Sequence, residues 1–88
     1  MSLYNFYRSE QWQNLLKVLK NDPKRMDANG NLVCSHCGLP IVKKYDCIGH
    51  HIIELTEENY TDYNISLNPV NIQLVHHKCH NIIHNKLY

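Results

Sequence analysis

The chain has 88 residues, a formal net charge of +1 and a hydrophobic fraction of 43%, which indicates one small folded domain rather than a multidomain or disordered chain. Its apolar runs fall short of the roughly 20 residues that a membrane-spanning helix needs, and residues 1–7 lack a secretory apolar run, so we expect a cytoplasmic protein with no membrane partner. So small a domain needs a staple, and four cysteines in a reducing compartment favour a metal over disulfides.

Charge is distributed unevenly along the chain. Residues 1–44 carry seven basic and three acidic side chains, a net charge of +4, whereas residues 45–88 carry a net charge of −3. Four basic residues of the first part lie close together: Lys17, Lys20, Lys24 and Arg25. This cluster predicts a surface that follows a phosphate backbone, although a solvated helix face explains the lysines equally well.

The first 26 residues form a lead-in that contains one amphipathic helix. The helix should begin near Ser9, a suitable N-cap, and Pro23 should end it or begin a new turn. Its apolar stripe occupies positions i, i+3, i+4 and i+7: Trp12, Leu15, Leu16 and Leu19.

Two cysteine-containing segments then share a two-residue spacing. The first, Cys34-Ser35-His36-Cys37, follows a turn-forming stretch, and the second is His76-His77-Lys78-Cys79. Two such pairs can close a tetrahedral zinc site from Cys34, Cys37, His76 and Cys79. Cys47 competes with His76 for the fourth position, but we favour a buried core role for it.

Between and after these segments the expected elements alternate. The β-branched residues of 41–53 predict extended chain, in the form of a hairpin that contains the pair His50-His51. Residues 54–70 predict a polar loop, residues 72–75 a strand, and residues 77–86 a helix. Adjacent strand residues point to opposite sides, so both histidines can address one site only if the chain bends or bulges, which Gly49 would permit.

The histidine pair, Asn71 and His80 together have the residue types of a metal-dependent nuclease site. Phosphodiester cleavage requires a cation to offset charge on the phosphate, a neutral imidazole to take a proton from water, and a group that orients this imidazole. Each requirement has a candidate here.

The chain resembles the HNH endonucleases over residues 34–84. The resemblance is carried by three segments: Gly49-His50-His51-Ile52-Ile53-Glu54-Leu55, Asn68-Pro69-Val70-Asn71-Ile72-Gln73-Leu74 and Cys79-His80. It implies an α+β fold: one domain over residues 1–88, in which a zinc-stapled ββα-metal core at residues 34–86 follows the N-terminal helix.

The resemblance also implies a role for each site residue. His51 corresponds to the general base, Asn71 to the residue that orients it, and His50 and His80 to ligands of one catalytic divalent cation. Many relatives have a carboxylate where this chain has His50, and imidazole suits Mn²⁺, Ni²⁺ or Zn²⁺ better than Mg²⁺. His84, one helical turn beyond His80, is either a further ligand or phosphate contact, or a surface residue.

The expected function is therefore cleavage or nicking of DNA, with structural zinc and a catalytic cation as cofactors. The products implied are 5′-phosphate and 3′-hydroxyl ends, and phage packaging or other DNA-processing proteins are the candidate partners. The alternative is a non-catalytic zinc module that binds DNA or protein. That alternative accounts for the cysteines but gives no reason for His50, His51, Asn71 and His80.

Overall fold

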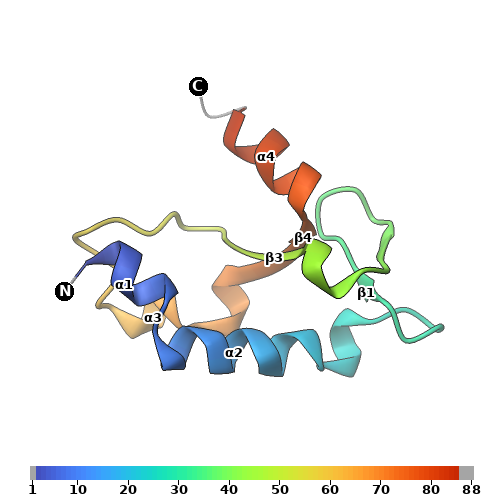
Figure 1. Cartoon of the computed structure of the whole chain (residues 1–88), viewed down its shortest axis with the longest axis horizontal. Helices are drawn as coiled ribbons and strands as arrows, with labels where there is room; N and C mark the ends of the chain where they lie inside the picture. The colour runs from blue at the N-terminus through green and yellow to red at the C-terminus, as the bar shows by residue number, and fades with distance from the viewer. Residues whose placement is uncertain (1, 86–88) are drawn as a thin grey trace.

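A two-stranded antiparallel sheet lies between an N-terminal helix and a C-terminal helix in this computed structural model (Figure 1). The structure describes residues 2–85, leaving out the side chains of Lys44, His84 and Asn85. The helices are α1 Leu3–Tyr7, α2 Glu10–Lys20, α3 Tyr63–Ser66 and α4 His77–Asn85, with 3-10 turns η1 Pro23–Arg25, η2 Lys44–Asp46 and η3 Pro69–Asn71. The strands are β1 Leu32–Val33, β2 Pro40–Ile41, β3 Cys47–His51 and β4 Ile72–His76. The predicted α+β class is confirmed.

The N-terminal helix forms as its apolar stripe predicts. The Ser9 hydroxyl oxygen accepts a hydrogen bond from the backbone N–H of Trp12, and Trp12 and Leu19 are buried at 4% and 3% exposure. Helix α2 ends at Lys20, and Pro23 begins η1 rather than ending the helix itself. The preceding helix α1 was not predicted; it buries Phe6 against the same core.

The main hairpin joins strands that are far apart in the sequence. Strand β3 pairs with β4 in a register that runs from Cys47 opposite His76 to His51 opposite Ile72. The prediction of a hairpin within residues 41–53 was therefore wrong, because β2 pairs with β1 instead. Strand propensity identified the extended segment but not the strand with which it pairs. Strand β4 is the partner because its apolar side chains complete the core: Ile72, Leu74 and Val75 are at most 1% exposed.

The segment predicted as a polar loop packs against the core. Residues 54–70 include α3, which begins after the N-cap Asp62, and they bury Leu55, Tyr60 and Ser66. Helix α4 follows β4 directly, as predicted, while the predicted helix residue Lys86 lies outside the described residues. Among residues 2–85, no helix combines the length and apolarity that crossing a membrane requires.

Gly49 is needed for close packing rather than for a bend. The ladder between residues 47–51 and 72–76 runs without a bulge, so the expected bend at Gly49 was wrong. A Cβ atom at this position would lie 2.5 Å from the Leu16 Cδ2 atom and 3.2 Å from the Trp12 ring. The missing side chain therefore lets α2 rest directly on β3.

Gly49→Ala should destabilise the fold by about 1–3 kcal/mol, because the added methyl group overpacks the contact between α2 and β3. Urea unfolding monitored by Trp12 fluorescence would measure the loss. In the double variant with Leu16→Ala, which removes the nearest atom, the glycine substitution should cost less than it does alone. Equal stability of Gly49→Ala and wild type would contradict the close-packing explanation.

Candidate functional site

The first chemical cluster joins the two cysteine-containing segments. The possible ligand atoms of Cys34, Cys37, His76 and Cys79 all lie within 4.8 Å of one another. His76 Nδ1 is 3.4 Å from the Cys37 sulfur and 3.9 Å from the Cys79 sulfur. Bond lengths of about 2.3 Å to sulfur and about 2.0–2.1 Å to nitrogen place neighbouring ligand atoms of tetrahedral zinc roughly 3.4–3.8 Å apart. The cluster thus suits a metal ion such as zinc.

The orientation of the His76 ring supports metal binding. Its Nε2 atom is 3.1 Å from the Pro40 carbonyl oxygen, and because a carbonyl only accepts, Nε2 must carry the proton. The neutral ring then presents its lone pair at Nδ1, the atom directed at the sulfurs. Outer hydrogen bonds of this kind commonly orient metal-bound histidines.

The thiols of the cluster differ in how readily they ionise. Burial, reinforced by the sulfurs of Cys34 and Cys37, raises the pKa of Cys79 to about 12. Burial also acts to raise the pKa of Cys34, but hydrogen bonds from the backbone of Cys37, His76 and His36 outweigh it and lower that pKa to about 6. A bound cation would remove the repulsion and allow all three thiolates to form.

Cys47 lies outside this cluster. Among the residues whose side chains are described, the group of three or more candidate ligands contains His76 and not Cys47. Cys47 pairs with His76 across the hairpin, is 5% exposed, and burial raises its pKa. It packs in the core, as the sequence favoured.

The second chemical feature is a pair of imidazoles on different elements. His50 projects from β3 and His80 from α4, and their ring centroids are 5.4 Å apart with planes inclined at 71°. Two rings at this separation can each bring a nitrogen to one shared cation at about 2.0–2.2 Å. A cation held by these two rings alone would keep further coordination positions open. The side chain of His84, the predicted additional ligand, lies outside the described part of the structure.

His51 points to the opposite face of β3 from His50. Strand alternation without a bulge separates the two rings, so the structure pairs His50 with His80 and places His51 beneath the N-terminal helices. The His51 residue is 5% exposed, and its ring is stacked on Trp12 at a centroid distance of 4.8 Å. The arrangement that the sequence suggested, with three imidazoles in one cluster, is not found among the described side chains.

The hydrogen bond of His51 selects one tautomer. Its Nε2 atom lies 2.9 Å from the Ser66 carbonyl oxygen, so Nε2 is the donor and the lone pair of the neutral ring is at Nδ1. Burial lowers the pKa of His51, partly opposed by this hydrogen bond, and so favours the neutral ring that a base requires. Sequence reasoning missed the Ser66 carbonyl, because a backbone acceptor has no residue-type signal.

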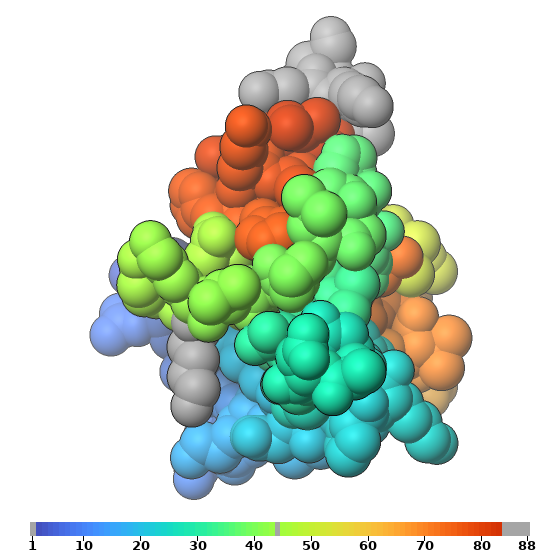
Figure 2. All heavy atoms as spheres, turned by 90° about the vertical axis from the view of Figure 1, so that its right-hand side faces the viewer, coloured from blue at the N-terminus to red at the C-terminus, as the bar shows by residue number. Residues whose placement is uncertain are grey.

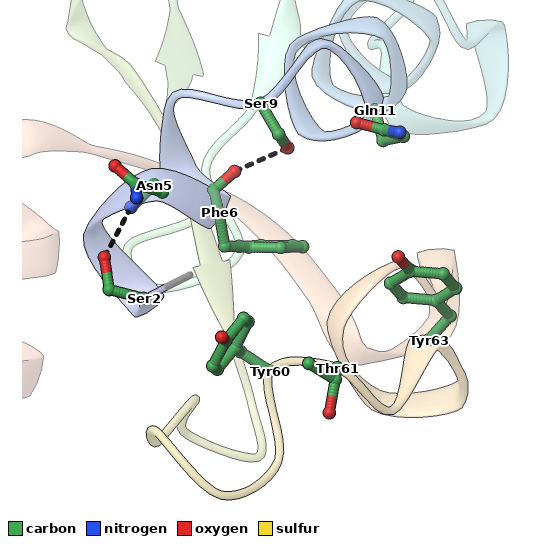
Figure 3. Close-up of a pocket in the computed structure, with 8 residues that line it drawn as sticks. All are labelled: Ser2, Asn5, Phe6, Ser9, Gln11, Tyr60, Thr61 and Tyr63. Atoms are coloured by element: carbon green, nitrogen blue, oxygen red, sulfur yellow. Dashed lines mark hydrogen bonds between the residues drawn. The ribbon is translucent and has the colours of Figure 1, made fainter.

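Aromatic side chains cover the His51 ring. Phe6 and Tyr7 approach it edge-on at 6.4 and 6.1 Å, in addition to the stacked Trp12. A cavity of about 170 Å³ lies next to this cover, where Phe6 of α1 lies near Tyr60 of the loop that precedes α3 (Figure 3). Typical ligand pockets measure about 300–1,000 Å³, so this cavity is too small for a nucleotide.

Asn71 connects the segments on either side of His51. Its side-chain oxygen accepts from the Ile53 backbone N–H at 2.8 Å, and its side-chain nitrogen donates to the Ile65 carbonyl at 2.9 Å. Its own carbonyl accepts from the Ile52 N–H at 2.8 Å. The 7% exposed residue thus ties the end of β3 to α3, whose Ser66 holds the His51 ring.

The predicted basic cluster divides into two parts. Lys17 and Lys20 line a groove of about 690 Å³ between α2 and the β1–β2 region, and Lys24 is exposed on η1. The guanidinium of Arg25 instead donates to two backbone carbonyls of the protein. Lys24 and Arg25 line a second hollow of about 270 Å³, apart from the groove of Lys17 and Lys20.

The polar and aromatic side chains outside these clusters differ in their exposure. His36 and His77 are exposed. Glu54 is exposed and acts on Tyr7, whose pKa is raised by burial and by this carboxylate. Tyr45 and Tyr63 are 80% and 60% exposed, whereas Tyr60 packs in the core.

Comparison with known proteins agrees with these features. Residues 34–86 match a family model described as HNH endonuclease. A curated protein of Lactococcus phage SK1, named as a probable HNH endonuclease, is 37% identical over 76 residues, which cover 86% of this chain and 71% of the relative. No solved structure matches the chain significantly.

Proposed function

The chain belongs to the HNH endonuclease family, and from this membership we propose that it is a metal-dependent endonuclease that hydrolyses DNA to 5′-phosphate and 3′-hydroxyl ends. The observation that carries the proposal is the contact between the imidazole rings of His50 and His80, which come from separate elements. The cluster of Cys34, Cys37, His76 and Cys79 is the proposed structural zinc site, so these two rings remain for a second metal ion. A zinc-binding module without catalytic activity would not need the pair His50 and His80.

His50 and His80 are the proposed protein ligands of the catalytic cation, and His84 is the candidate for a third. Such a cation supplies positive charge to the phosphate oxygens during cleavage. Neither His50 nor His80 offers an oxygen ligand, and a nitrogen-only pair suits Mn²⁺, Ni²⁺ or Zn²⁺ better than Mg²⁺.

His51 is the proposed general base. Its Nδ1 lone pair would take a proton from water as the water oxygen bonds to phosphorus and the bond from phosphorus to the 3′ oxygen breaks. The departing 3′ oxygen would take a proton from a solvent water and become the 3′-hydroxyl. Asn71 would hold this segment in place through its hydrogen bonds to Ile53 and Ile65. The His51 ring is buried on the opposite face of β3 from His50. The proposal therefore requires that the aromatic cover from α1 and α2 moves and that the end of β3 turns when DNA binds, so that His51 and a cation at His50 reach the same phosphate.

We propose Lys17, Lys20 and Lys24 as contacts to the phosphate backbone. Lys17 and Lys20 border the groove beside the region of residues 26–42, which faces the viewer in Figure 2. Contacts of this kind supply affinity without reading the base sequence. Since a relative is encoded by a phage, we propose DNA-processing proteins of a phage, such as packaging proteins, as partners in the host cytoplasm.

A metal titration of plasmid cleavage tests the proposal. The purified protein should relax or linearise plasmid with Mn²⁺ or Ni²⁺ at least as fast as with Mg²⁺, because both proposed ligands are imidazoles. His80→Ala should require more Mn²⁺ for any remaining activity. Strong preference for Mg²⁺ would contradict the ligand assignment, and no cleavage with any of these ions would contradict the nuclease proposal.

One observation favours the alternative of a non-catalytic zinc-binding module for DNA or protein. His51 is 5% exposed and satisfied by Ser66, which is also how a structural core histidine would be placed. The two functions differ in the effect that replacing this ring has on DNA cleavage.

A further inference from the structure

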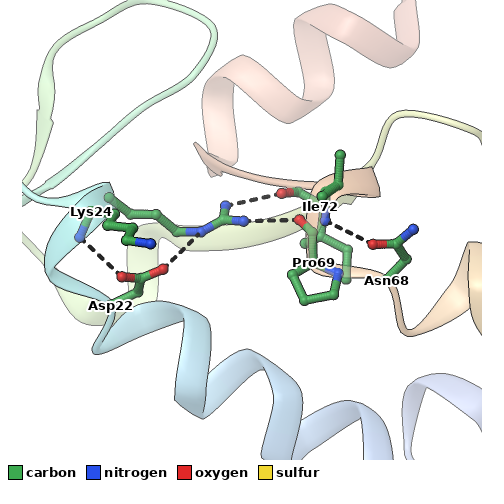
Figure 4. A network of polar contacts seen from close by, with 7 residues as sticks. Asp22, Lys24, Asn68, Pro69 and Ile72 are labelled. Atoms are coloured by element: carbon green, nitrogen blue, oxygen red, sulfur yellow. Dashed lines mark hydrogen bonds and ion pairs between the residues drawn. The ribbon is translucent and has the colours of Figure 1, made fainter.

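Arg25 reaches across the molecule to the backbone around Asn71. Its Nη1 atom donates to the Ile72 carbonyl and its Nη2 atom to the Pro69 carbonyl, each at 2.9 Å (Figure 4). These partners are 47 and 44 residues away in the sequence. The Nε atom lies 3.9 Å from the Asp22 carboxylate, which holds the guanidinium from the other side.

The two acceptor carbonyls flank Asn71. Pro69 is the first residue of η3 and Ile72 is the first residue of β4, so the two ends of the turn that carries Asn71 are joined through one side chain. Ile72 is also the residue opposite His51 in the hairpin register. Arg25 therefore binds the backbone of this turn through the Pro69 and Ile72 carbonyls. The Asn71 side chain binds the chain just after β3 through the Ile53 N–H.

The geometry suits arginine specifically. A guanidinium is planar and presents its N–H donors in a fixed fork, whereas the ammonium of lysine is a compact point charge. Charge-assisted hydrogen bonds are also stronger than neutral ones. The two nitrogens of the planar guanidinium thus hold the two carbonyls at a fixed spacing. A single lysine ammonium cannot reproduce this spacing.

We propose that Arg25 is a positioning residue of the nuclease site, which clamps the carbonyls on both sides of Asn71 so that Asn71 can hold the segment that follows His51. The inference rests on the proposed function in the roles of Asn71 and His51. It also separates Arg25 from the neighbouring Lys24, with which it shares charge and a short turn but not its contacts.

Steady-state cleavage of a labelled DNA duplex in Mn²⁺ tests the clamp. Arg25→Ala should lower kcat roughly 10- to 100-fold, as expected for misplacement of a catalytic group, with KM and the salt dependence of binding unchanged. Arg25→Lys should fall between this variant and wild type. The matched control is Arg8→Ala, which removes the chain's other arginine from an exposed site and should leave kcat and KM unchanged.

The opposite pattern would overturn the inference. If Arg25 contacts DNA, Arg25→Ala should raise KM and reduce the salt slope by about 1 with kcat unchanged, the result expected for Lys24→Ala. Wild-type kcat and KM in Arg25→Ala would also exclude the clamp. If Arg25→Ala does not fold, Arg25→Lys decides: a lowered kcat supports the clamp, and a wild-type kcat reduces Arg25 to a purely structural residue.

Amide hydrogen exchange tests the same clamp without catalysis. In Arg25→Ala, or in Arg25→Lys to a lesser degree, the Ile52 and Ile53 amides bonded to Asn71 should exchange faster by about 10-fold or more. The Cys34 amide, which donates to the Leu39 carbonyl beside the first cysteine-containing segment, should exchange at the wild-type rate. Equal acceleration of all three, or of none, would contradict local positioning. Because this measurement needs no cleavage, failure of the clamp and failure of the nuclease proposal are distinguishable.

Discussion

His51→Ala should lower the rate of DNA cleavage by roughly 10²- to 10⁴-fold, the usual contribution of a positioned general base. The Ser66 carbonyl holds the Nε2–H, so only Nδ1 of the neutral ring is available to take a proton, and alanine has no equivalent atom. Single-turnover cleavage of a labelled duplex with saturating Mn²⁺ measures the chemical step. Zinc content and the unfolding midpoint, measured on the same samples, show whether the variant is folded.

His51→Gln is the matched control for this experiment. Its amide can still donate a hydrogen bond toward the Ser66 carbonyl, yet it cannot accept a proton near neutral pH. If His51 is the base, both variants lose activity; if the ring only fills the space under Trp12, His51→Gln should retain most of it. Equal activity in both folded variants would mean that another residue is the base or that the cleavage comes from a contaminating nuclease.

Removal of zinc should unfold the domain. Apparent binding free energies of about 10–16 kcal/mol for structural zinc in finger peptides equal or exceed the roughly 5–15 kcal/mol that stabilises a typical domain. Cys34 is 1% exposed, lies within the cluster, and accepts a hydrogen bond from the His76 backbone N–H. Chelation of the wild type, or Cys34→Ser, should therefore abolish cooperative thermal unfolding, as followed by near-UV circular dichroism together with zinc analysis.

Cys47→Ser makes the same chemical change outside the cluster. Cys47 is 5% exposed, so burying a hydroxyl in place of its thiol should cost about 1–3 kcal/mol, but the bound zinc should remain at the wild-type content. Loss of zinc from Cys47→Ser with retention in His76→Ala would mean that the fourth ligand is misassigned. Retention of zinc and of cooperative unfolding in Cys34→Ser would contradict the stapling role.

Features set by neighbouring residues were predictable from the sequence. Helix α2 follows from its apolar period and its Ser9 cap, and the helix from His77 follows from the pattern that places Cys79 on its inner face. The family resemblance was also recognisable, because the HNH-type segments keep their residue types and order in the chain.

The placement of the site residues depended on contacts between distant segments. The pairing of β3 with β4 is decided by which strand completes the core, and Gly49 gains its role only when α2 rests on that strand. The sequence predicted that Arg25 is a surface charge, but its guanidinium binds backbone carbonyls that are 44 and 47 residues away in the chain.

The amino-acid sequence by itself determined the chemical inventory of this protein: three candidate cysteine ligands with His76 or Cys47 as the fourth, the histidines at 50, 51 and 80, and the family to which the chain belongs. Only the tertiary structure decided that His51 lies across the strand from His50, bound to Ser66 and stacked on Trp12. The physical reason is that residue type and spacing are local properties. The face on which a side chain lies, and the backbone groups that it meets, depend on strand register and packing between segments that chain order does not specify.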